Sequence, residues 1–211
     1  MIRRLVLAAA LCLGLAPALF SQVAPGYRMY GPHGSTDAYL IDNTGAVIHT
    51  WPSGGEPGTG MYLDADGTLV RCIRVPGIGI GGNGGQVQRI AFDGTLLWDF
   101  VMADADRWQH HDIEILPNGN VLMIAWDRLT DAYAIAAGRD PALISGTDWL
   151  PDGIFEVQQT GPTTGAIVWE WHMMDHVIQD FDSTKPNFGV VADHPELLDI
   201  NFPPKVTSNG D

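Results

Sequence analysis

Short apolar strands separated by glycine-containing turns recur along this 211-residue chain. Residues 39–51, 87–98 and 154–169 share one pattern, in which an apolar strand, a turn with glycine and a second strand ending at tryptophan follow one another. The three tryptophans, Trp51, Trp98 and Trp169, lie 47 and 71 residues apart. Alternating apolar segments joined by such turns predict antiparallel β-hairpins.

A second kind of hairpin lies between these copies. Residues 61–71 turn at Asp66-Gly67 and residues 111–123 turn at Asn118-Gly119, so the two turn glycines are 52 positions apart. Glycine supplies the positive φ that tight hairpin turns require. Two hairpins in a unit of about 50 residues are typical of a four-stranded propeller blade, which buries its faces against neighbouring blades.

We therefore predict an all-β chain that forms about three four-stranded blades of a β-propeller, at approximately residues 27–75, 86–127 and 154–211. The alanine-rich segment 130–137 predicts a short helix inserted at one rim of a blade, with Thr130 as its N-cap and Gly138 as its C-cap. The alternative fold is a β-sandwich of hairpins without radial symmetry.

Three blades are too few to close a propeller, because closed ones usually contain about four to eight blades. An open arc would leave long unpaired strand edges, which proteins avoid by closure or association. We therefore expect these residues to be the front part of a longer protein. Closure by self-association of identical arcs is the alternative.

The first 21 residues predict a secretory signal peptide, because Arg3 and Arg4 precede an uncharged apolar run over residues 5–20. The run is shorter than the roughly 20 residues that span a bilayer, and Pro17 interrupts it. We expect cleavage near Ser21, which leaves one domain over residues 22–211 in a secreted or periplasmic protein with no stable membrane insertion. An uncleaved membrane anchor is the alternative.

Removal of this peptide takes away two of the 11 basic residues and none of the 25 acidic ones, so the formal charge becomes −16. This acidic composition argues against nucleic acid as a partner, and an anionic substrate would need a local positive cluster. Cys72 is then the only cysteine, which excludes an internal disulfide and a zinc site built on thiolates. We expect no metal and no cofactor.

The chemical centre of the sequence is the histidine pair, His110 and His111, followed by Asp112 and a predicted strand. Imidazole can serve as base, nucleophile or ligand near neutral pH. Neighbours on a strand point to opposite sides, so we expect one ring to face a central channel and the other to pack or hydrogen bond. A purely structural role for both histidines, with Asp112 fixing the turn, is the alternative.

Three segments resemble the bacterial aryl-sulfate sulfotransferases, enzymes that move sulfate between phenols without a nucleotide donor. The segments are 110–120, from His-His-Asp to Leu-Pro-Asn-Gly-Asn, 134–141, and 167–180 around Trp-Glu-Trp-His-Met-Met-Asp-His. The resemblance implies a six-bladed propeller in which histidines from several blades meet in the central channel. It also implies phenols and phenolic sulfate esters as the small-molecule partners.

By this resemblance, a histidine nitrogen attacks the sulfur of an aryl sulfate, the phenol leaves, and a second phenol takes up the sulfuryl group. Neutral imidazole is a competent nucleophile, and other histidines or arginine can neutralise the sulfate oxygens. The resemblance assigns His110 or His111 to a sulfate contact and makes His176, which follows Asp175, the next candidate. His172 is expected to pack, and a surface position on a loop is the alternative for His176.

Two other functions fit a secreted propeller. One is a non-catalytic module that binds a glycan or a protein through its loops, with structural histidines. The other is a quinone-dependent dehydrogenase, which is weakened because adjacent cysteines and a set of cofactor ligands are missing from the sequence. Asp64-Ala65-Asp66-Gly67 resembles the start of a calcium loop, but Val75 stands where the twelfth-position glutamate belongs.

The family's further blades supply another channel histidine, an arginine and the histidine that carries the sulfuryl group, and none of these has a counterpart here. We therefore predict that the 211-residue chain alone does not transfer sulfate. In an assay with 4-nitrophenyl sulfate, adding a phenol should not increase the release of nitrophenol. Acceptor-dependent release would contradict this prediction.

Overall fold

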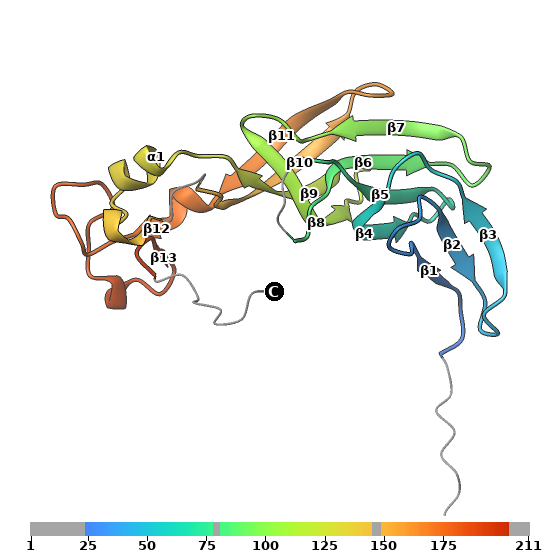
Figure 1. The fold of residues 1–211 in the computed structure, drawn as a ribbon, viewed down its shortest axis with the longest axis horizontal. Coiled ribbons are helices and arrows are strands. Elements are labelled where there is room, and N and C mark those ends of the chain that lie inside the picture. Colours follow the sequence, from blue (N-terminus) through green and yellow to red (C-terminus); the bar gives the residue numbers. More distant parts are fainter. Residues whose placement is uncertain (1–23, 78–80, 145–148, 203–211) are drawn as a thin grey trace, which may run out of the picture.

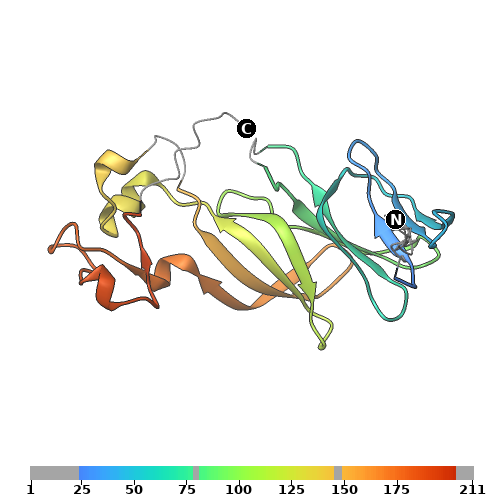
Figure 2. The same cartoon turned by 90° about the horizontal axis from the view of Figure 1, so that it is seen from below.

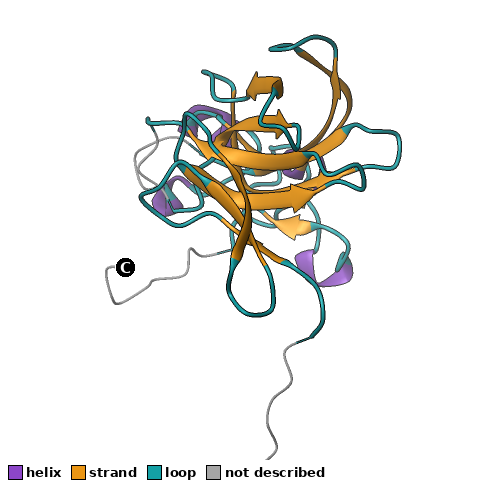
Figure 3. Cartoon of the chain, turned by 90° about the vertical axis from the view of Figure 1, so that its right-hand side faces the viewer, coloured by secondary structure: helices purple, strands orange, loops and turns teal. Residues whose placement is uncertain are grey.

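The computed structural model describes residues 24–77, 81–144 and 149–202, so the predicted signal peptide lies outside the described residues. The described part of the chain is all-β, as predicted (Figures 1 and 3), and contains 13 strands and only short helical segments. Most strands belong to three antiparallel sheets that follow one another in chain order. In the described part of the chain, no helix is long and apolar enough to cross a membrane.

Each of the three sheets is an antiparallel meander, in which every strand pairs with the next one in the sequence. The first sheet contains β1 (Arg28–Tyr30), β2 (Ala38–Ile41) and β3 (Val47–Trp51). The second sheet contains β4 (Pro57–Leu63), β5 (Leu69–Arg74), β6 (Gly85–Ile90) and β7 (Leu96–Val101). The third sheet contains β8 (Arg107–Ile115), β9 (Val121–Asp127), β10 (Asp152–Gln159) and β11 (Gly165–His172).

The sheets divide the chain at other points than the predicted blades. The expected unit 27–75 joins the whole first sheet to half of the second, and the unit 86–127 joins the other half to half of the third. The hairpin patterns were correct, but the tryptophan-ended hairpin closes a sheet rather than opening one. Hairpin patterns alone do not indicate which neighbouring hairpins share hydrogen bonds.

The hairpins that close the three sheets share one irregularity. The pairing register shifts at Leu40/Ile41 in the first sheet, at Arg89/Ile90 in the second and at Glu156/Val157 in the third. Each shift stands close to the turn of its hairpin. A β-bulge at this place increases the local twist of the strands, so its recurrence marks the three sheets as copies of one local design.

Two apolar cores hold consecutive sheets face to face. Neighbouring residues of β5 point to opposite sides of the second sheet, as the pleat requires: Leu69 joins the core shared with the first sheet, and Val70 joins the core shared with the third. Both side chains are fully buried. Burial of such a side chain contributes about 1.5–3 kcal/mol, so the second sheet is stabilised on both faces.

The last strand of a sheet carries a tryptophan whose indole N–H reaches the following sheet. Trp51 Nε1 donates to the Ala91 carbonyl oxygen at 3.2 Å, and Trp98 Nε1 donates to the Thr164 carbonyl oxygen at 3.0 Å. Both acceptors lie in the closing hairpin of the next sheet, and both indoles are 0% exposed. Trp169, at the corresponding place in β11, is 49% exposed. The repeated tryptophan is thus a contact between sheets.

The predicted short helix is confirmed as α1 (Asp131–Ala136), and the side chain of its N-cap Thr130 accepts from the Tyr133 amide. The C-cap is Ala137 rather than the predicted Gly138, which follows it with a φ of +102°. The remaining segments are η1 (Pro141–Leu143), η2 (Met173–His176), β12 (Val177–Ile178), η3 (Val191–Asp193) and β13 (Leu198–Asp199). They lie beyond the third sheet, at the end of the molecule opposite the first sheet (Figures 1 and 2).

The indole contacts generate a prediction with a matched control. Trp98→Phe should lower the free energy of unfolding by about 2 kcal/mol, because it removes a buried hydrogen bond and leaves a void. Trp169→Phe should change it by less than about 0.5 kcal/mol, because the ring is half exposed. Urea denaturation of both variants measures the difference, and equal losses would contradict the role of the indole in holding the sheets.

Candidate functional site

A bulge in β8 places the histidine pair. Gln109 is paired with Ala125 and Ile113 with Met123, so three residues of β8 stand opposite a single residue of β9. His111, within the bulge, has a φ of +50°, a left-handed conformation that is uncommon outside glycine and in which histidine is overrepresented. Its amide donates to the Gly82 carbonyl oxygen at 2.7 Å. The backbone of the pair is therefore held by the loop between β5 and β6.

The bulge brings both rings to the same side. The Nδ1 atoms of His110 and His111 lie 2.7 Å apart, and the rings are nearly perpendicular. The expectation that the rings point to opposite faces is therefore wrong, because it assumed regular strand alternation. The rings still differ in their surroundings, since His110 is 3% exposed and His111 is exposed to solvent.

His110 is fixed from three directions. Its Nε2 lies 3.0 Å from Oδ1 of Asp152, the first residue of β10. Its ring stacks on Trp126 at 4.1 Å between centroids, and its Nδ1 contacts His111. Burial with every ring nitrogen engaged makes His110 a rigid part of the sheet.

His111 lies against Gly82. A side chain at position 82 would place its Cβ about 2.1 Å from the imidazole, and the φ of +77° there also favours glycine. The Thr59 hydroxyl, from β4 of the second sheet, donates to the His111 carbonyl oxygen. The first strands of the second and third sheets contact each other here, so the histidine pair lies where two sheets meet.

Gly82 and Thr59 also line a cleft of about 510 Å3, which we call the glycine cleft. Its other lining residues include His33, Pro57, Arg74 and Asn83. Nη1 of Arg74 lies 3.9 Å from Oε2 of Glu56, and both side chains are about half exposed. Their ion pair is therefore weak, and the guanidinium can bind another anion. Arg74 and His33 are the cationic or ionisable groups among the residues that line this cleft.

Asp112 has a structural task in the bulge. Its Oδ1 accepts from the Ile113 amide at 2.9 Å and from the Tyr62 hydroxyl at 2.9 Å. The hydrogen bond to Asp112, with a smaller effect of burial, raises the pKa of Tyr62 to about 12. Tyr62 therefore remains protonated at neutral pH and keeps donating across the two sheets.

His176 is separate from the pair. It ends η2, and its ring stacks on Trp171 at 4.8 Å between centroids. The pair lies on β8 and His176 follows β11, with β9 and β10 between them, so three strand spacings of roughly 5 Å separate their strands. The structure thus brings together two of the three candidate histidines.

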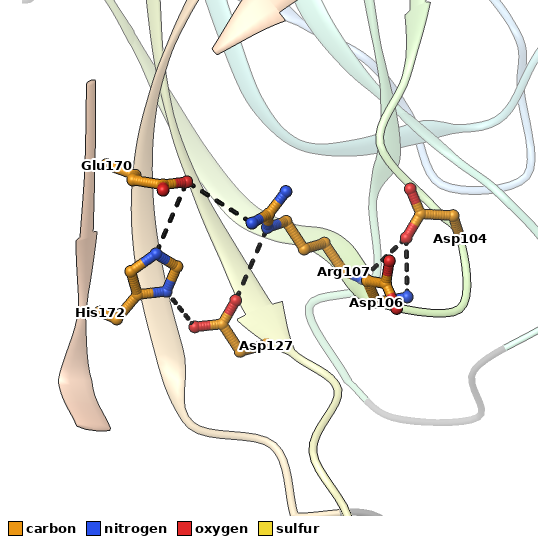
Figure 4. A network of polar contacts seen from close by, with 6 residues as sticks. All are labelled: Asp104, Asp106, Arg107, Asp127, Glu170 and His172. Carbon is orange, nitrogen blue, oxygen red and sulfur yellow. Dashed lines mark hydrogen bonds and ion pairs between the residues drawn. The ribbon is translucent and has the colours of Figure 1, made fainter. Parts of the chain in front are cut away.

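His172, expected only to pack, belongs to a polar network (Figure 4). Its Nδ1 lies 2.5 Å from Asp127 Oδ2, and its Nε2 lies 3.6 Å from Glu170 Oε2. Arg107 contacts the same two carboxylates at 3.7 and 3.5 Å. The ring also packs on Phe155, so the packing prediction was incomplete rather than wrong.

The network changes the acidity of His172. Burial lowers the pKa of His172, but the hydrogen bond and the negative charge of Asp127, together with the charges of Glu170 and Asp175, outweigh burial and raise the pKa above its usual 6.5. The folded protein therefore favours the protonated form of His172 more than the unfolded chain does. Among the described residues, no cluster of three or more histidine, cysteine, aspartate or glutamate side chains could hold a metal ion.

Sequence reasoning missed Asp152 and Asp127. Both are aspartates at strand ends, far along the chain from the histidines that they contact, and local spacing gives no signal for such pairs. The strand register brings each aspartate to its histidine. Asp152 is the strand partner of Trp126, on which His110 stacks, and Asp127 is the strand partner of Arg107, which belongs to the network of His172. Register depends on bulges that the sequence does not reveal.

Comparison with known proteins leaves the family open. No family model and no curated protein matches the chain. A solved structure of a protein of unknown function from Bacteroides caccae is similar with a TM-score of 0.43 and 18% sequence identity. The match covers 71% of this chain and 41% of that one, so this chain spans less than half the length of its structural neighbour.

The raised pKa of His172 predicts a pH-dependent contribution to stability. The protonated ring stabilises the folded state fully below the unfolded pKa of about 6.5, and this contribution is lost as the pH rises through the higher folded value. His172→Gln should therefore cost more stability at pH 5.5 than at pH 9, as measured by urea denaturation. In an Asp127→Asn background this pH dependence should shrink, and an unchanged dependence would contradict the assigned cause.

Proposed function

We propose that this chain forms part of an aryl-sulfate sulfotransferase, in which the histidine pair and the glycine cleft bind the sulfate end of a phenolic ester. The observation that carries the proposal is the exposed imidazole of His111 beside a cleft that contains an arginine. The guanidinium group can neutralise the non-bridging oxygens of a sulfuryl group, and the imidazole can act on a phenolic oxygen during transfer. The histidine that carries the sulfuryl group is contributed from elsewhere.

Charge supports this use of the cleft. The whole chain has a formal charge of −14, so an anion is repelled by most of the surface and needs a local positive site. Arg74 and His33 line such a site together with the backbone of Gly58 and Gly82, where no side chain hinders close approach. A volume of about 510 Å3 also suits one aromatic ring with its sulfate group.

The arrangement of the sheets supports a propeller architecture for this function. Three meanders pack face to face in chain order, and the first strands of successive sheets contact each other. In a propeller, first strands line the central axis, so residues of β4 and β8 would face it. The proposed fold is thus an incomplete propeller with the histidine pair on an inner strand.

Binding can be tested without transfer. The 211-residue chain should bind 4-nitrophenyl sulfate in isothermal titration calorimetry, and Arg74→Ala should weaken that binding about tenfold, since a charge-assisted hydrogen bond contributes about 1.5–3 kcal/mol. Arg28→Ala, which removes an equal charge from an exposed arginine bonded to Asn43, is the matched control.

Two outcomes would contradict the proposal. One is an equal loss of affinity in Arg28→Ala and Arg74→Ala, which would indicate nonspecific attraction of the anion. The other is equal binding of 4-nitrophenol and its sulfate ester, which would show that the cleft recognises the ring alone. In a preparation that transfers sulfate, changing both His110 and His111 to asparagine should abolish transfer and leave ring binding largely intact.

A further inference from the structure

The hydrogen bonds around the histidine pair have a direction. An ionised carboxylate can only accept, so the contact between Asp152 Oδ1 and His110 Nε2 requires the proton on Nε2 of His110. A neutral His110 then has an unprotonated Nδ1, which must accept. The 2.7 Å contact between the two Nδ1 atoms therefore requires that Nδ1 of His111 donates.

A neutral His110 is favoured by its surroundings. Its side chain is 4% exposed, so a cationic ring would bury a charge that Asp152, whose side chain is 49% exposed, pairs only in part. The reverse arrangement, in which a cationic His110 donates through both nitrogens, would place a positive charge in this buried position. With a neutral His110, both imidazoles are uncharged. Each of the two contacts, Asp152 with His110 and His110 with His111, then has one donor and one acceptor.

We infer that Asp152 and His110 hold His111 in the tautomer that carries its proton on Nδ1, so that Nε2 of this exposed side chain is an unprotonated acceptor for phenols and other weakly acidic hydroxyl compounds. Within the described residues, Nε2 of His111 has no hydrogen-bond partner, and the side chain is exposed. His110 and Asp152 are positioning residues in this arrangement, because they act through His111.

The arrangement defines one proton transfer. The proton of a bound hydroxyl group moves to Nε2 of His111, and the electron pair of the broken O–H bond stays on the oxygen, which becomes the stronger nucleophile. His111 becomes an imidazolium that still donates through Nδ1 to His110. The negative charge of Asp152, reached through His110, favours this cation.

This inference does not depend on sulfate transfer, so the two proposals fail separately. The glycine cleft could bind no sulfate ester while His111 keeps its tautomer, and a cleft that binds the ester would be compatible with either tautomer. A second histidine–aspartate pair among the described residues, His172 with Asp127, is the control for His110 with Asp152. His172 lies on the other edge strand of the third sheet.

Long-range proton–nitrogen correlation spectra of the 15N-labelled 211-residue chain at neutral pH test the inference directly. We expect an unprotonated Nε2 and a protonated Nδ1 for His111, with the opposite pattern for His110, and His111→Asn identifies the signals. A proton on Nε2 of His111, or an average of both tautomers, would overturn the inference.

Chemical modification tests the role of Asp152. Diethylpyrocarbonate reacts with unprotonated imidazole nitrogens, and mass spectrometry of the peptide locates the product. Asp152→Asn should slow modification of His111 on the order of tenfold, because the carboxylate that sets the tautomer is lost. Asp127→Asn should leave the rate at His111 unchanged. Equal rates at His111 in the unaltered chain and in Asp152→Asn would overturn the assignment of Asp152 as a positioning residue.

Discussion

The fold depends on the indole N–H that one sheet donates to the next. Trp51 and Trp98 are fully buried, so each needs an acceptor, and the closing hairpin of the following sheet provides it. This requirement, together with the two apolar cores, restricts how consecutive sheets can stack. The stacking in turn brings β4 against β8, where Thr59 meets the backbone of His111. A contact at the last strands therefore sets the geometry of the site at the first strands.

Local pattern was sufficient to predict the hairpins and α1, because alternation, turn glycines and a capping threonine act over a few residues. The grouping of hairpins into sheets was mispredicted, because the hydrogen bonds between β5 and β6 join strands across residues that carry no periodic signal. The site was foreseen in its histidines but not in its partners. Asp152 reaches His110 only through the register of β8, β9 and β10, which a bulge of three residues alters.

The third sheet carries two histidine–carboxylate pairs with contrasting chemistry. His172 sits between Asp127, Glu170 and Arg107, and the surplus of negative charge raises its pKa and favours the cation. His110 has a single carboxylate and a second imidazole as neighbours, and it is more deeply buried. One sheet thus places the same residue types in a network of several charged groups at one edge and in a buried contact between two imidazoles and one carboxylate at the other.

The left-handed backbone at His111 restricts how this position can vary in evolution. Residues with a branched Cβ are strongly disfavoured at a φ of +50°, whereas asparagine, aspartate and glycine are tolerated there. Most single changes would thus disturb the bulge as well as the ring. The backbone conformation at this position tolerates only a few residue types, and among them histidine alone carries an imidazole. Loss of the imidazole during divergence would leave asparagine, aspartate or glycine as the trace of a former site.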